Sequence, residues 1–144
     1  MKECRMTELE MNKAFMVAYA RLTIGAHKHR VRAEQRSVSR YFNHTAGRFV
    51  FARMMLLAYF NAQPHKYTIT RVAETLNMSR QATSYMIHEC LDAEYIVKCK
   101  DRGYFAGDEL LESFLAFMPL HESVIKDSGI IDFYLGLQAA RKVV

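Results

Sequence analysis

The chain has 144 residues, of which 51% are hydrophobic, so it can bury the core of one compact domain without disulfides or metals. Its formal net charge of +5 favours a polyanionic partner such as nucleic acid. The 3 cysteines include no C-x-x-C spacing, which argues against a disulfide framework or a zinc site and favours a reducing, cytoplasmic location.

The positive charge is concentrated in the N-terminal part of the chain. Residues 1–60 contain 11 Lys and Arg against 4 Asp and Glu, whereas residues 106–144 contain 3 against 6. The first ten residues have acidic side chains where a signal peptide needs an apolar run, and the longest apolar stretch, residues 54–60, is too short to span a bilayer. We therefore expect neither secretion nor a membrane partner.

The first predicted helix runs from about Glu8 to Ile24. Thr7 and Glu10 have the spacing of a capping box, and apolar residues then recur at helical spacing. Gly25 loosens this helix, and the basic segment 26–40 has little apolar periodicity. This segment is either a continuation of the helix or a mobile arm. Its charges contact DNA, face solvent or pair with the acidic tail of a partner subunit.

A second helix is predicted over residues 46–61. It is apolar almost all round, as expected of a helix at the centre of a small fold, and it ends before Pro64. Core packing explains its many Met and Phe side chains, although the same side chains also suit an effector pocket.

A pair of short helices is predicted between residues 67 and 96. Thr68 can cap the first and Ser79 the second, with Asn77 in the left-handed conformation that a helix C-terminus needs. Each helix has a buried stripe at i, i+3, i+4 and i+7, made of Ile69, Val72, Ala73 and Leu76 in the first and of Thr83, Met86, Ile87 and Cys90 in the second. Two such stripes joined by a three-residue turn predict a helix-turn-helix.

The second helix of this pair then turns five side chains outward. We call them the outward row: Arg80, Gln81, Ser84, Tyr85 and His88. Such a row is typical of a recognition helix in the major groove of DNA, because Gln can pair with adenine, Arg with guanine, and Ser or Tyr with a base edge or a phosphate. The free N–H groups beginning at Ser79 also favour a phosphate. The alternative is an ordinary solvated helix face.

The C-terminal part begins with a predicted hairpin. Residues 95–106 are β-prone and are split by Asp101, Arg102 and Gly103. Asp108 is expected to cap a helix that Pro119 interrupts, and residues 130–144 to form a last helix. The predicted fold class is therefore mainly α with a small β-hairpin.

The segment VAETLNMSRQATSYMIHECLDAEYIVKCKDRGYF resembles the winged helix-turn-helix of the MarR superfamily of bacterial transcription regulators. The likeness rests on Ala73 in the first helix, on Ser79 and Arg80 at the start of the second, on the exit at residues 93–96, and on Asp101 and Arg102 near the tip of the wing. Three positions depart from the family pattern, since Asn77 and Glu94 stand where Gly is usual and Thr83 stands where Val is common. The predicted wing is also shorter than the family's.

The resemblance implies a single domain with a winged DNA-binding part at residues 46–106 and dimerisation helices at 7–24 and 108–144. It implies a homodimeric transcription regulator that binds double-stranded DNA at a near-palindrome with half-sites about 34 to 36 Å apart. The apolar content of the terminal helices agrees, because it exceeds what one small monomer hides: Phe114, Leu115, Phe117, Met118, Ile131, Phe133, Tyr134 and Leu137. Whether a small-molecule effector exists is left open.

The predicted DNA contacts combine the helix pair and the hairpin: Ser79, Arg80, Gln81, Ser84, Tyr85, His88, Lys100 and Arg102. Arg102 is expected to contact the minor groove or the DNA backbone, with a plain charge at the turn as the alternative. On this hypothesis Arg102→Ala weakens binding to all DNA sequences alike, whereas Gln81→Ala relaxes specificity at one base pair.

Other classes of function find less support in the sequence. It has no phosphate-binding Gly loop, no H-E-x-x-H motif and no nucleophile elbow, so we expect neither an enzyme nor a cofactor. His27 and His29 lack the further ligands of a metal site. Cys90 is expected in the core, which leaves Cys4 and Cys99 as the candidates for an oxidant sensor. The alternative function is a winged-helix adaptor that binds a protein and not DNA.

Overall fold

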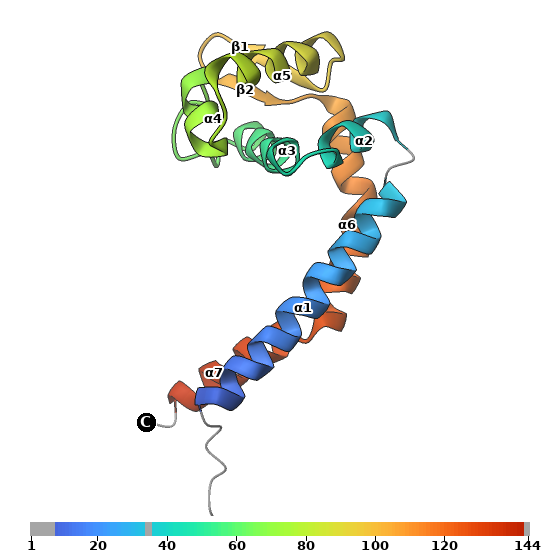
Figure 1. The fold of residues 1–144 in the computed structure, drawn as a ribbon, viewed down its shortest axis with the longest axis vertical. Coiled ribbons are helices and arrows are strands. Elements are labelled where there is room, and N and C mark those ends of the chain that lie inside the picture. The colour runs from blue at the N-terminus through green and yellow to red at the C-terminus, as the bar shows by residue number, and fades with distance from the viewer. Residues whose placement is uncertain (1–7, 34–35, 143–144) are drawn as a thin grey trace, which may run out of the picture. The chain divides into compact units, whose positions relative to one another are not determined.

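The protein is mainly helical and has one small antiparallel hairpin (Figure 1), which confirms the predicted fold class at this level. The computed structural model describes residues 8–33 and 36–142. The elements follow one another as α1 (Glu8–Ala33), α2 (Ser37–Asn43), α3 (Ala46–Tyr59), α4 (Ile69–Leu76), α5 (Arg80–Asp92), β1 (Ile96–Cys99), β2 (Gly103–Ala106), α6 (Asp108–Ser128) and α7 (Ile130–Lys142).

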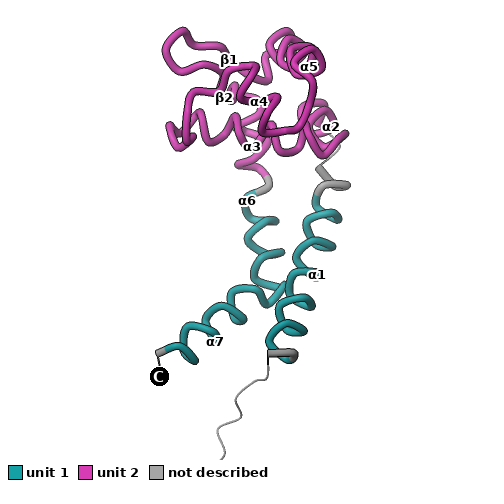
Figure 2. Tube along the Cα trace, turned by 60° about the vertical axis from the view of Figure 1, so that its left-hand side comes forward, with its two compact units in different colours: residues 1–32, 117–144 teal, residues 33–116 magenta. Residues whose placement is uncertain are grey.

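The chain divides into two compact units (Figure 2). Unit 1 comprises residues 1–32 and 117–144, and unit 2 comprises residues 33–116. Unit 2 encloses the segment 46–106 that the sequence assigns to DNA binding, together with α2 and the first part of α6. The second part of α6 belongs to unit 1 with α1 and α7.

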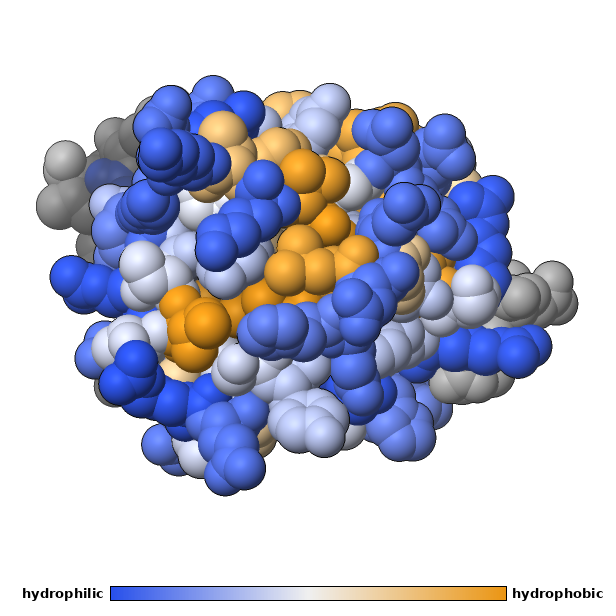
Figure 3. Space-filling model, turned by 90° about the horizontal axis from the view of Figure 1, so that it is seen from above, coloured by the Kyte–Doolittle hydropathy of each residue, from blue (hydrophilic) through white to orange (hydrophobic). Residues whose placement is uncertain are grey.

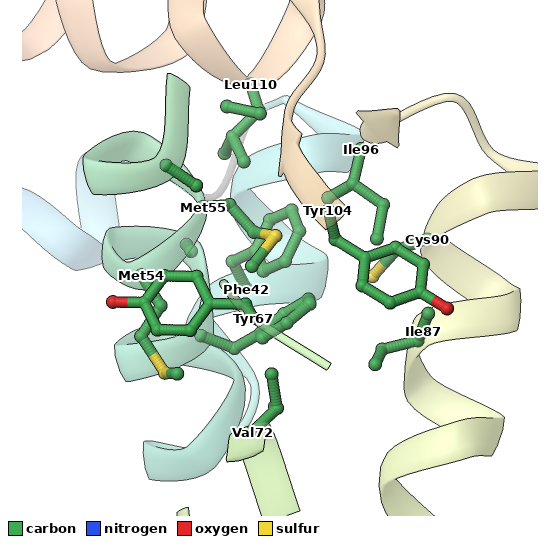
Figure 4. Close-up of a cluster of buried hydrophobic side chains, with 14 of the residues drawn as sticks. Phe42, Met54, Met55, Tyr67, Val72, Ile87, Cys90, Ile96, Tyr104 and Leu110 are labelled. Atoms are coloured by element: carbon green, nitrogen blue, oxygen red, sulfur yellow. The ribbon is translucent and has the colours of Figure 1, made fainter. Parts of the chain in front are cut away.

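Unit 2 is built around α3, which packs against α2, α4 and β2. α5 in turn packs against α4 and β1, so side chains from all these elements meet in one core (Figure 4). Its fully buried members include Phe51, Met55 and Ile87. Each such side chain contributes about 1.5 to 3 kcal/mol through burial. This core fixes the positions of α4, α5 and the hairpin within the unit.

The hairpin is tied to the segment that precedes α4. β1 and β2 pair antiparallel, with Ile96 opposite Ala106 and Cys99 opposite Gly103. Gly103 also forms a bridge with Tyr67. Gly103 has a φ of +75°, and a Cβ on it would lie 2.8 Å from the carbonyl oxygen of Tyr67. Only glycine meets both conditions, because it alone enters the left-handed region freely and allows so close an approach of two backbones.

In unit 1 the long helix α1 passes through Gly25 and ends at Ala33, so the predicted end near Ile24 is wrong. The reason is tertiary, because a Cβ on Gly25 would lie 2.8 Å from Cγ1 of Val124 on α6. Gly25 therefore permits close packing of two helices instead of ending one. The basic segment 26–40, left open by the sequence, is helical in its described parts, at the end of α1 and the start of α2.

The predicted interruption of α6 at Pro119 is also wrong, since the helix continues through this residue. Proline removes one helical hydrogen bond, and the turns on either side nevertheless continue the helix. Asp108 lies inside the first turn of α6 and not before it, because the N–H of Leu111 donates to the carbonyl oxygen of Gly107 at 3.1 Å. Thr7, one half of the predicted capping box, lies outside the described residues.

The predicted central position of α3 holds for one side of the helix. Its buried residues are Phe51, Ala52, Met54, Met55 and Ala58. On the other side Val50, Leu57 and Phe60 are exposed. α3 is therefore apolar all round without being covered all round. Across the described residues, none of the helices is both long enough and apolar enough to cross a membrane.

Candidate nucleic-acid interface

The candidate interface is organised by the two caps and the turn between α4 and α5, and all three predictions about them are confirmed. The Thr68 hydroxyl accepts a hydrogen bond from the N–H of Arg71 at 3.2 Å, and the Ser79 hydroxyl accepts one from the N–H of Ala82 at 3.1 Å. Asn77 has φ 51° and ψ 47°, the left-handed conformation. Each cap satisfies a donor that the helix itself leaves unpaired and stabilises its helix by about 1 kcal/mol.

The buried face of α5 consists of the four residues that the spacing predicts: Thr83, Met86, Ile87 and Cys90. Thr83 needs a polar partner there, and its hydroxyl donates to the carbonyl oxygen of Ser79 at 2.9 Å. This bond satisfies the hydroxyl inside the core, as a buried polar group requires. The rotation of α5 about its axis is therefore fixed, and with it the direction of the opposite face.

The outward row lies on that opposite face. Arg80, Gln81, Tyr85 and His88 are exposed, and Ser84 is half-buried. Tyr85 is the most exposed large side chain of the row, with 71% of its surface accessible. Ser79 is exposed as well, but its hydroxyl is engaged as the cap. The exposure leaves five side chains of the predicted site available to a partner.

His88 is held in one tautomer by its own helix. Its Nδ1 lies 2.7 Å from the carbonyl oxygen of Ser84, which can only accept a hydrogen bond, so Nδ1 carries the proton. When the ring is neutral, Nε2 is then its hydrogen-bond acceptor. An acceptor at this position suits an amino group on a base edge, such as that of adenine or cytosine.

Arg102 lies in the turn of the hairpin, as the sequence predicts, and its side chain is bound to α3. Its Nη2 donates to the carbonyl oxygens of Ala58 and Tyr59, both at 2.9 Å, at the C-terminal end of α3. The guanidinium carbon lies 4.9 Å from the centre of the Phe105 ring. Arg102 is therefore not the plain charge at the turn that was the alternative, and its expected contact with DNA stays a prediction. The negative end of the dipole of α3 attracts the guanidinium.

Two lysines outside the predicted site lie close to the predicted residues Arg80 and Lys100. Lys66 and Lys98 surround a cavity of about 290 Å³ together with Lys100 and Arg80, and we call it the basic cavity. The Nζ of Lys66 donates to the carbonyl oxygen of Lys100 at 3.1 Å. Sequence reasoning missed Lys66 and Lys98 as site residues. The sequence offered two signals for them, since Lys66 shortly precedes the capping Thr68 and Lys98 lies on a predicted strand.

The side of α5 that faces α2 and α3 carries a polar cluster. The Tyr41 hydroxyl donates to Oε2 of Glu89 at 2.8 Å, and Nη2 of Arg48 lies 3.7 Å from the same oxygen. Burial raises the pKa of Tyr41 above its ordinary value, and burial raises the pKa of the neighbouring Cys90 thiol to about 11. The positive charge of Arg48 thus partly offsets the negative charge of Glu89, which lies on α5. Cys90 keeps its proton near pH 7 because its pKa is raised.

The view from the side of α5 and the hairpin shows a mostly hydrophilic surface crossed by a narrow band of hydrophobic residues (Figure 3). Val97 on β1 is exposed on the hairpin. A surface of this mixed kind offers apolar contacts, for example to a thymine methyl group, between polar ones.

Metal ligands are sparse in the part of the chain that the structure describes. Within it, no three His, Cys, Asp or Glu side chains are placed to hold a metal ion. The ring of His29 pairs with that of His121 at 6.1 Å between ring centres.

No relative is found. No protein-family model matches the chain, and neither the curated proteins nor the solved structures contain a match.

Proposed function

We propose that this chain is a MarR-like winged helix-turn-helix regulator that binds double-stranded DNA with α5 in the major groove. The observation that carries the proposal is the outward row. Four of its five members are exposed, and the helix that bears them is fixed in rotation by its buried face. In this proposal α4 and α5 are the helix pair and the hairpin is the wing. Recognition helices use the same N-terminal turns to reach base edges.

Specificity would come from three positions of the outward row. Arg80 suits the O6 and N7 acceptors of guanine, and Gln81 suits the N6 and N7 pair of adenine. His88 would add an acceptor through Nε2. Each good bidentate pair discriminates against the wrong base by about 1 to 3 kcal/mol, so two or three such contacts account for a specific site.

Affinity would come from the hairpin and from the segment before α4. Lys66, Lys98 and Lys100 are exposed cations beside the N-terminal ends of α4 and α5. Contacts of lysine to phosphate release counterions, and binding should therefore weaken steeply as salt rises. Arg102 is not part of this contact set, because its guanidinium is engaged with α3.

Dimerisation would use the apolar surface of unit 1. Large hydrophobic residues are exposed on all three of its helices, among them Met16, Tyr19 and Ile24 on α1, Met118 and Ile125 on α6, and Ile131, Tyr134 and Leu135 on α7. So much exposed apolar surface marks an interaction site in a monomer. A second copy of this chain is the proposed occupant, which gives two recognition helices for two half-sites. A cytoplasmic location remains a prediction from the cysteine content.

The test is selection of bound duplexes from a random library at near-physiological salt, followed by sequencing. We expect an enriched near-palindrome with half-sites about 34 to 36 Å apart. In Gln81→Ala the preference at one base pair per half-site should relax, while Gln138→Ala, an exposed glutamine on α7, should leave the selected sequence unchanged. Selection without any enriched sequence would refute the proposal and favour the protein-binding adaptor.

A further inference from the structure

The basic cavity lies in unit 2 and is lined from three directions. Lys98 and Lys100 come from the hairpin, Arg80 from the start of α5, and Lys66 from the segment before α4. Its volume of about 290 Å³ lies near the lower limit of small-molecule sites, which begin at about 300 Å³. There is room for a phosphate and a small attached group.

The charges around the basic cavity are all of one sign. Its lining contains four cationic side chains and no Asp or Glu. Within the described residues, the ion pair that the structure shows joins Arg48 to Glu89, outside the cavity. The lining cations have weaker contacts, since Lys66 donates to a backbone oxygen and the Nζ of Lys98 lies 5.7 Å from the Tyr104 ring centre. Converging cations without a counter-charge repel one another, so an anion between them would be stabilised.

The start of α4 adds neutral donors to these cations. Ile69 and Thr70, the first two residues of the helix, line the basic cavity. The first N–H groups of a helix have no partner within it, and the Thr68 cap satisfies the one that belongs to Arg71. Free N–H groups and the positive end of the helix dipole together favour a phosphate oxygen.

The walls of the basic cavity are held in place by the backbone. The bridge between Tyr67 and Gly103 joins the hairpin to the segment before α4, and no side chain fits at Gly103. On the other side of the same turn Arg102 binds the end of α3. The backbone segments that carry the cations are therefore held relative to one another, which lowers the entropic cost of binding a ligand.

We propose that the basic cavity binds a small organic molecule through its phosphate monoester group. A dianionic monoester suits four cations and helix N–H groups better than the single charge of a phosphodiester does. Because Arg80 and the three lysines of the cavity are also proposed DNA contacts, an occupant would compete with DNA for all four cations. That consequence alone rests on the proposed function.

The first test is a titration of the full ¹⁵N-labelled chain with inorganic phosphate at constant ionic strength, followed by NMR. We expect saturable shifts of the Ile69, Thr70 and Gly103 amides. Lys98→Gln combined with Lys100→Gln should weaken binding about tenfold or more, as the loss of charged hydrogen bonds implies. Lys126→Gln, on α6 in unit 1, is the matched control and should bind like the wild type. Shifts that do not saturate, or equal affinity in the double variant, would overturn the proposal.

The second test separates the two sources of phosphate. Ribose 5-phosphate, a monoester, is compared with a thymidine dinucleotide, whose phosphate is the diester of a DNA backbone. Tighter binding of ribose 5-phosphate supports the proposal, and tighter binding of the dinucleotide assigns the cavity to the DNA backbone and overturns it. Neither titration contains duplex DNA, so failure of the proposed DNA binding would leave both results intact.

Discussion

Replacement of Arg102 by Ala tests whether this side chain anchors the hairpin on α3. In the structure one nitrogen, Nη2, donates to the carbonyl oxygens of Ala58 and Tyr59, both at 2.9 Å. The guanidinium carbon lies 4.9 Å from the Phe105 ring centre, and Nε is buried without a hydrogen-bond partner among the described residues. The variant loses the hydrogen bonds of Nη2 and the contact with the Phe105 ring, and it also removes the unpaired Nε.

The expected loss of stability follows from these three contributions. A hydrogen bond from a charged donor contributes about 1.5 to 3 kcal/mol, and we count the two once because a single nitrogen makes both. The cation–π contact adds about 0.5 to 1 kcal/mol. Removal of the buried, unpaired Nε returns about 1 to 2 kcal/mol. Taken at the midpoints of these ranges, the contributions lower the free energy of unfolding of Arg102→Ala by about 1.5 kcal/mol.

The assay is urea unfolding followed by circular dichroism at a single protein concentration. Lys100→Ala is the control, because Lys100 is exposed on the same turn and its side chain should contribute less than about 0.5 kcal/mol. Equal stabilities of Arg102→Ala and Lys100→Ala would refute the anchoring argument.

Three further changes test other parts of the structure. Glu94 has a φ of 61° and occupies the left-handed region after α5, so Glu94→Gly should raise the free energy of unfolding by about 0.5 to 1 kcal/mol. Asp92→Gly, in α5, should lower this free energy, and both are measured by urea unfolding. A lower free energy of unfolding in Glu94→Gly would argue against strain at this residue. Gly25→Ala should lower the free energy of unfolding by about 1 to 2 kcal/mol through the contact with Val124, and adding Val124→Ala to this variant should relieve the loss. Gly136→Ala is the control and should be stabilising, because no atom lies within 4 Å of its added Cβ. Burial raises the pKa of Cys90 from 9.0 to about 11, so between these pH values the folded state keeps a proton that the unfolded state releases. The contribution of Cys90 to stability is therefore complete below about pH 9 and falls between pH 9 and 11. Cys90→Ala should show a smaller decline of the free energy of unfolding over that range, and an unchanged dependence on pH would contradict the assignment.

The features that the sequence predicts correctly are local. The caps at Thr68 and Ser79 and the left-handed Asn77 depend on residues at most three positions away. The buried face of α5 depends only on helical period. The residue type of Glu94, in contrast, does not predict its positive φ of 61°.

The features that the sequence misses are tertiary. Arg102 binds carbonyl oxygens 43 and 44 positions away, and no local pattern indicates that the end of α3 lies beside the hairpin. Gly25 has the residue type of a helix end, yet its role depends on Val124, which lies on another helix. Lys66 joins Lys98 only because the bridge between Tyr67 and Gly103 brings their segments together.

The position of Arg102 changes how the hairpin would act in DNA binding. A wing that reads DNA through a free arginine near its tip has to order that side chain on binding, at a cost of about 0.5 to 1.5 kcal/mol. Here Arg102 holds one side of the hairpin to the end of α3. The bridge between Gly103 and Tyr67 holds the other side. Lys98 and Lys100 are then presented at a fixed position relative to Arg80. Loss of the anchor should therefore weaken phosphate binding in the basic cavity as well, although Arg102 does not line it.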